Sequence, residues 1–122
     1  PFGPVDAWTL LEDVLVGGCV GETLAAARAC DDAQRAPSAG LRAHFQTIAE
    51  DEAKHAALAY RTCSWLLDRE RDRTLSHRFA ARRDELVGAL SPAAARRVGR
   101  AAATSTRPTP ATRSSTVLLA RP

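Results

Sequence analysis

Two long stretches of helical periodicity, separated by one break at Ala36-Pro37-Ser38, constrain the fold of this chain more than any other feature. Pro37 cannot stay inside a helix, and Ser38 can cap the helix that follows it. We expect the first helix over residues 6–35 and the second over residues 39–70. Helices joined by so short a connection pack as an antiparallel hairpin.

The rest of the chain is also expected to be helical, apart from its end. Of the 122 residues 45% are hydrophobic and only 5% are aromatic, so the core is built mainly from Ala and Leu, and no run alternates as a strand would. We predict an all-α fold. A third helix is expected over 73–90, and Ser91-Pro92 starts a short helix that reaches about residue 103. The predicted organisation is a hairpin over 1–70, a basic helical extension over 71–103 and a disordered tail over 104–122.

Each long helix carries a carboxylate within an apolar stripe. Counting in steps of four and three, the second helix aligns Leu41, Phe45, Ile48, Glu52, His55, Ala59, Thr62 and Leu66, and the first aligns Trp8, Leu11, Leu15, Gly18, Glu22, Ala25 and Ala29. Glu22 lies 13 residues before the end of the first helix, and Glu52 lies 13 residues after the start of the second. The two carboxylates therefore reach the same level of the hairpin. Both stripes are predicted to face inward.

Glu22, Glu52 and His55 form the candidate metal site. A buried ionised carboxylate costs several kcal/mol unless a partner charge or a metal compensates it. Glu52 and His55 are three residues apart, on one helix face, and both can reach a point opposite Glu22. Such a donor set suits iron or manganese and also accepts zinc. The alternative is that Arg28, or His55 itself, satisfies the carboxylates without a metal.

Two segments resemble a known family. Residues 18–26 (GCVGETLAA) and 48–61 (IAEDEAKHAALAYR) look like the second half, helices three and four, of a bacterial ferritin-like domain. The resemblance covers about residues 6–67. It implies that the chain forms half of a four-helix bundle and supplies half of a dinuclear iron centre that reacts with dioxygen or peroxide. On this resemblance Glu52 would bridge the metals, and Glu22 and His55 would each terminate one.

The first helix pair of that family is missing here, and no second Glu-x-x-His follows residue 67. Either an upstream helix pair or a second copy of the chain, in a homodimer, would complete the site. The dimer arrangement resembles encapsulated ferritins, whose chains end in a flexible linker and an apolar docking peptide, as Thr116-Val117-Leu118-Leu119 could be. The sequence also starts at Pro1 and contains no Met, so we expect a fragment, a processed product or an incomplete gene model.

Charge divides the chain into an acidic and a basic half. Residues 1–60 hold nine acids and four bases, a net of −5, and residues 61–122 hold five acids and thirteen bases, a net of +8. Acids interrupt the basic half, and Phe79 is the only aromatic residue between Arg69 and Arg100, which favours an ion-paired helical surface over a nucleic-acid interface. No segment has the roughly 18 to 20 apolar residues of a membrane helix.

The function that competes with metal binding is a non-catalytic helical interaction module whose basic extension contacts a partner.

Cysteine and glycine give weaker signals. Cys19, Cys30 and Cys63 have no Cys-x-x-Cys spacing, so we predict small buried apolar residues and neither a disulfide framework nor a zinc site. Gly18, one turn before Glu22, leaves room either for a metal or for close helix contact. Trp65, like Trp8, is interpreted as a core or interface anchor.

Overall fold

The computed structural model describes residues 5–106, which are almost entirely helical. In chain order the elements are α1 (Ala7–Asp13), the π-helical segment η1 (Val14–Gly21), α2 (Glu22–Arg35), α3 (Ala39–Glu70), α4 (Arg73–Gly88) and α5 (Pro92–Ser105). No strand occurs between residues 5 and 106. The all-α prediction is confirmed.

The helix ends follow local sequence signals. Residue Ala36, which precedes Pro37, is extended with ψ 129°, and α2 therefore ends at Arg35. A side-chain oxygen caps the start of each helix that follows a connection, by accepting a backbone N–H: Asp6 from Thr9 (2.9 Å), Ser38 from Leu41 (3.2 Å), Asp72 from Thr74 (2.8 Å) and Ser91 from Ala94 (3.2 Å). The predicted bounds of the second helix are confirmed, and α4 ends two residues earlier than predicted.

The start of the tail was predicted too early in the sequence, at residue 104. Thr104 and Ser105 belong to α5, and their hydroxyls bond back to the carbonyl oxygens of Arg100 (2.9 Å) and Ala101 (2.7 Å). These bonds and the preceding alanines extend the helix past residue 103. The remainder of the predicted tail, with the proposed docking peptide at 116–119, lies outside the described residues.

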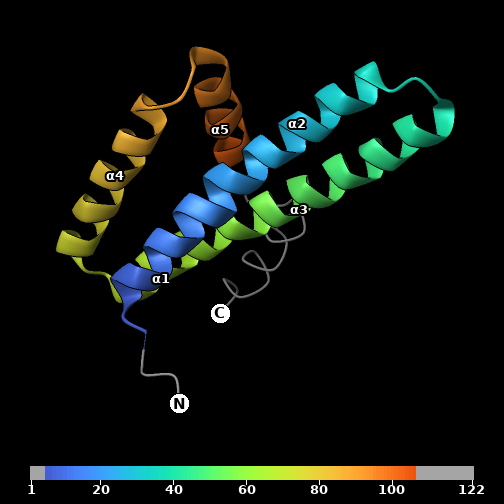
Figure 1. Cartoon of the computed structure of the whole chain (residues 1–122). Coiled ribbons are helices and arrows are strands. Elements are labelled where there is room, and N and C mark those ends of the chain that lie inside the picture. Colours follow the sequence, from blue (N-terminus) through green and yellow to red (C-terminus); the bar gives the residue numbers. More distant parts are fainter. Residues whose placement is uncertain (1–4, 107–122) are drawn as a thin grey trace, which may run out of the picture.

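The first long helix is one continuous rod made of α1, η1 and α2, and it packs antiparallel against α3 (Figure 1). The sequence did not predict its π-helical middle. There, the backbone N–H of Glu22 reaches the carbonyl oxygen of Gly17, five residues earlier. Three glycines fall in η1 and lower the preference for a regular α-helix. A period of 3.6 residues in the apolar pattern gives no signal for such a local change.

The core lies on one side of the hairpin, where α4 and α5 pack (Figure 1). Leu11 is completely buried, and Val98 of α5 is 6% exposed beside the hairpin residues. The hydroxyl of Tyr60 lies 3.2 Å from the carbonyl oxygen of Cys19 and 3.3 Å from that of Val98. One phenol on α3 thereby links η1 to α5. Within the described residues, neither α4 nor α5 covers the opposite side of the hairpin.

Gly18 marks a close approach of the two long helices. A Cβ at this position would lie 2.6 Å from the Cβ of Ala59, whereas one at Gly17 would meet no atom within 4 Å. Of the two interpretations of Gly18, close helix contact is the one that the structure supports.

Gly18→Ala is expected to lower the free energy of unfolding by about 1–3 kcal/mol, because the two helices must separate to admit the methyl group. Gly17→Ala is the matched control and should be neutral or stabilise by about 0.5–1 kcal/mol, since alanine favours helix. Urea unfolding followed by circular dichroism measures both. Equal effects of the two substitutions would contradict the close contact.

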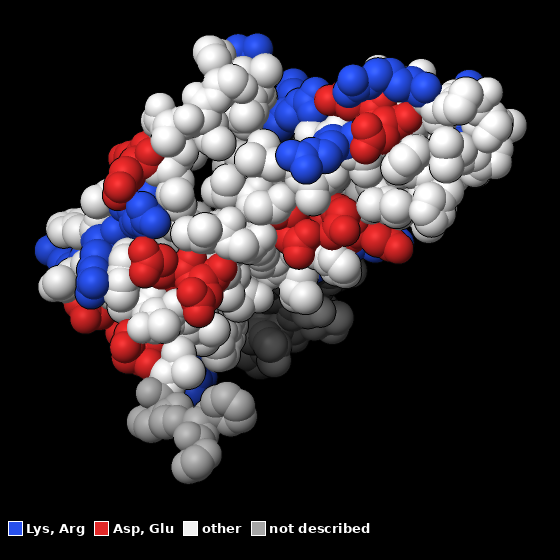
Figure 2. Space-filling model, in the orientation of Figure 1, with Lys and Arg blue, Asp and Glu red and all other residues white. Residues whose placement is uncertain are grey.

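Four arginines of the basic half, Arg69, Arg78, Arg82 and Arg83, pair with acids or lie over tryptophan rings. Arg82 bridges Glu12 of α1 (3.0 Å) and Glu85 of its own helix (3.2 Å). Arg78 lies over the ring of Trp8, 4.0 Å from its centroid. Figure 2 shows acidic and basic side chains intermixed on the visible face, without a continuous basic patch. This arrangement agrees with an ion-paired surface.

Two further sequence interpretations can be compared with the structure. Trp65 is 56% exposed, so it is not a core residue, and its role as an interface anchor stays a prediction. None of the described helices combines the length and the apolar character needed to cross a membrane.

Candidate metal centre

The three candidate ligands come from the two helices of the hairpin. Glu22 is the first residue of α2, and Glu52 and His55 lie near the middle of α3. Their spacing of three residues places Glu52 and His55 on one helix face. The antiparallel packing brings Glu22 to the same level, and one ligand atom from each residue lies within 4.8 Å of the other two. The predicted alignment of the carboxylates is confirmed.

The prediction that both stripes face the interior is wrong for this part of the hairpin. The side chain of Glu52 is 28% exposed and that of His55 is 61% exposed. Farther along the stripe, Ala59 and Leu66 are buried, whereas Leu41 is 41% exposed. Periodicity identifies residues that share a face, but it does not tell which neighbour covers the face. Here the described helices α4 and α5 pack on the other side.

Glu52 links the other two residues electrostatically. The Nδ1 atom of His55 lies 3.1 Å from Oε2 of Glu52. Hydrogen bonding to Glu52 raises the pKa of Glu22, and partial burial and the charge of Glu52 act in the same direction. Hydrogen bonds from Glu22 and then from His55 lower the pKa of Glu52. The proximity of the two carboxyl groups therefore favours the protonated form of Glu22 and the ionised form of Glu52.

This donor set fits a divalent transition metal. Two carboxylates and one imidazole are ligands that iron, manganese and zinc accept, at metal–ligand distances of about 2.0–2.2 Å. A divalent cation at this point would neutralise both carboxylates and favour the ionised form of Glu22. Among the described residues, no ion pair joins Arg28 to either glutamate, so the alternative that Arg28 satisfies them is not supported. The other alternative, in which His55 itself is the partner of a carboxylate, agrees with its 3.1 Å contact to Glu52.

An apolar groove adjoins the ligands on the same open side. It has a volume of about 440 Å³ and is lined by Asp13, Val14, Gly18, His55, Leu58, Ala59 and Thr62. Leu58 is 58% exposed within it. An apolar surface beside a polar cluster is the arrangement expected where another helix would pack.

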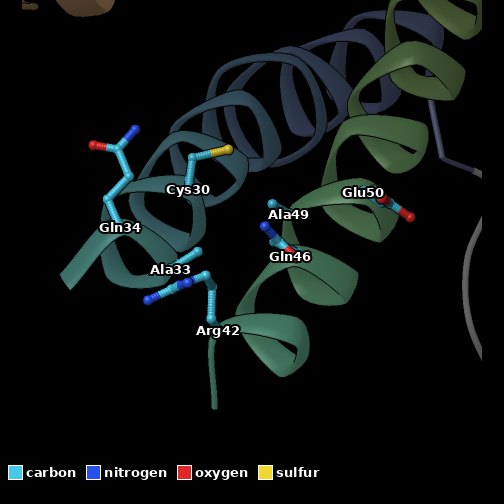
Figure 3. A pocket seen from close by; sticks show the side chains of 7 residues that line it. All are labelled: Cys30, Ala33, Gln34, Arg42, Gln46, Ala49 and Glu50. Carbon is cyan, nitrogen blue, oxygen red and sulfur yellow. The ribbon is translucent and has the colours of Figure 1, made fainter. Parts of the chain in front are cut away.

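A second cavity lies toward the tip of the hairpin and was not predicted. It measures about 510 Å³ and is lined by Cys30, Ala33, Gln34, Arg42, Gln46, Ala49 and Glu50 (Figure 3). Cys30 is exposed here, so the prediction of a buried residue is wrong for this cysteine and confirmed for Cys19 and Cys63. The lining contains a single carboxylate and no histidine, and none of these polar residues interrupts the apolar stripes. The sequence therefore carried no signal for it.

Glu22→Gln tests how much the proximity of two carboxyl groups lowers the stability of the metal-free protein. Because the folded state raises the pKa of Glu22, the stability gained from its proton is lost as pH rises above the ordinary glutamate value of about 4.3. Glutamine keeps a donor toward Glu52 and removes the titration. At pH 8 without metal, we expect the variant to melt about 2 °C above the wild-type chain. Thermal denaturation between pH 4 and pH 8 measures this, and identical pH profiles for the two proteins would contradict the raised pKa of Glu22.

Compared with protein-family models, with curated proteins and with solved structures, this chain matches none of them.

Proposed function

We propose that this chain is a ferritin-like metal-binding protein in which Glu22, Glu52 and His55 supply half of a dinuclear iron or manganese site. The observation that carries the proposal is the convergence of three ligand atoms within 4.8 Å from two different helices. The pKa of Glu22 is raised where two carboxylates meet, which is the electrostatic situation that a bound cation relieves.

The activity that we propose for the completed site is oxidation of Fe(II) by dioxygen or peroxide. The metals supply this redox chemistry when bound. The residues of this chain bind and orient: Glu52 and His55 are held together on rigid α3, and Glu22 approaches from α2. Deprotonation of Glu22 accompanies metal binding, so the affinity should increase with pH through the raised pKa of this residue.

The other half of the ligand set would come from a second copy of the chain or from another helix pair. The open side of the hairpin supports this proposal, because the apolar groove with Leu58 lies directly beside His55. A helix pair packed there would cover the groove and bring its own carboxylates to the ligands.

Native mass spectrometry of the purified chain, titrated anaerobically with Fe(II), tests the proposal. We expect a dimer that holds two iron ions. A chain that stays free of metal at Fe(II) concentrations well above the protein concentration would contradict metal binding. A monomer that binds iron would favour completion by another helix pair over self-association.

The second candidate is a non-catalytic helical interaction module. It is favoured by the exposure of large apolar side chains on α3, where Leu58 is 58% and Trp65 is 56% exposed. Such a module should tolerate Glu22→Gln combined with Glu52→Gln and keep its oligomeric mass. A metal-dependent assembly should lose that mass in the same double variant.

A further inference from the structure

Cys19 and Cys63 form a pair of thiols in the core. Their sulfur atoms lie 3.8 Å apart, although the residues are 44 positions apart in the sequence. Cys19 belongs to η1 and Cys63 to α3, and they are 1% and 4% exposed. The contact therefore joins the two long helices at a point shielded from solvent.

The helix geometry suits a covalent bond between these sulfurs. A disulfide has an S–S distance of about 2.05 Å, so the sulfurs must approach each other by roughly 1.8 Å, a movement that side-chain rotation can supply. One residue before Cys19, Gly18 brings the backbone of η1 against Ala59, one turn before Cys63. The two helices therefore already lie in close contact where the bond would form.

The surroundings distinguish the two thiols chemically. A hydrogen bond from Cys19 lowers the pKa of Cys63, against the opposing effect of burial. The same hydrogen bond and burial raise the pKa of Cys19. With Cys19 as the hydrogen-bond donor, this contact favours the thiolate at Cys63, so we assign Cys63 as the nucleophile and Cys19 as the thiol that reacts with it afterwards.

We propose that Cys19 and Cys63 form a reversible intramolecular disulfide on reaction with hydrogen peroxide. The Cys63 thiolate attacks one peroxide oxygen, the O–O bond breaks, and the departing hydroxide takes up a proton to become water. The sulfur of Cys19 then attacks the resulting sulfenic acid at Cys63, the S–O bond breaks, and a second water leaves with the Cys19 proton. In sum, two thiols lose two electrons and two protons, and one peroxide is reduced to two waters.

The bond would fasten η1 to α3. Access for peroxide requires η1 to move away from α3, and the glycines of this π-helical segment make it the least regular part of the hairpin. Once formed, the crosslink closes a loop of more than 40 residues, which restricts the unfolded chain. We expect the Tm of the oxidised protein to rise by about 10 °C.

The test uses the Cys30→Ser variant, which keeps the buried pair and removes the exposed thiol. The protein is treated with EDTA and then with hydrogen peroxide, so that the outcome does not depend on metal binding. In denaturant we expect two titratable thiols before treatment and none after it, with a mass loss of about 2 Da for two hydrogen atoms. Peptide mapping should find Cys19 linked to Cys63, and dithiothreitol should restore both thiols and the original Tm.

Adding Cys63→Ser to this variant provides the matched control, because a single buried thiol cannot close the bond. It should show neither the mass loss nor the rise in Tm. The proposal is overturned if both thiols survive peroxide, or if the Cys30→Ser protein gains oxygen atoms without forming the crosslink. Wild-type protein should give the same Cys19–Cys63 peptide, which covers the case of a poorly folded variant.

Discussion

Glu52→Ala is expected to lower the affinity of the chain for Fe(II) by about 100-fold or more. Glu52 stands between the other two candidate ligands: Nδ1 of His55 lies 3.1 Å from it, and its hydrogen bond raises the pKa of Glu22. Its loss removes one ligand and leaves the others without their common partner. Even the loss of a residue that only orients a metal ligand costs roughly 10- to 100-fold in affinity. Anaerobic isothermal titration calorimetry measures the change.

Glu50→Ala is the matched control. Glu50 lies on the same helix two residues earlier, and it lines the cavity at the hairpin tip instead of the metal site. It has the same charge as Glu52, so a general loss of acidic surface would affect both variants alike. We expect near wild-type affinity for Glu50→Ala. Similar losses in the two variants would argue for diffuse electrostatic attraction and against a defined site.

Leu11→Ala is expected to lower the free energy of unfolding by about 3 kcal/mol, within the range of 2–5 kcal/mol typical of a buried leucine. Leu11 is 0% exposed and belongs to the core cluster beneath α4 and α5. Truncation removes its apolar contacts and leaves a cavity among rigid helices. For a domain whose whole stability is about 5–15 kcal/mol, this is a large loss. Urea denaturation at 25 °C gives the value.

Leu10→Ala separates this core effect from a change in helix propensity. Leu10 precedes Leu11 in α1 and is 40% exposed. The two substitutions change the same chemical group in the same helix, so their difference reports burial. We expect Leu10→Ala to cost less than about 1 kcal/mol. Equal costs at the two positions would mean that Leu11 is not buried in the core in solution.

Helix positions and the matched level of the ligands were predictable because both depend on local chemistry and chain length. Pro37 ends one helix and Ser38 caps the next, as the hydrogen bond from Leu41 confirms. Equal distances from that break brought Glu22 and Glu52 together. These signals act within a few residues or along a rigid rod, so they can be counted along the chain.

The exposure of the candidate metal site and the contact between two cysteines could be found only in the tertiary structure. The apolar stripes predicted a buried site, yet His55 is exposed because α4 and α5 pack on the opposite side of the hairpin. The contact between Cys19 and Cys63 depends on how closely Gly18 lets the helices approach, and no spacing in the sequence encodes that distance.

The sequence alone thus determined the helices, their caps and the register of the hairpin, since capping and helical rise are local properties of the chain. The tertiary structure decided which face of the hairpin is covered and which thiols meet. The covered face depends on how α4 and α5 pack against the hairpin. The thiol contact depends on two residues that are more than 40 positions apart in the sequence. Apolar periodicity requires that a face be buried against something, and only three-dimensional packing selects the neighbour.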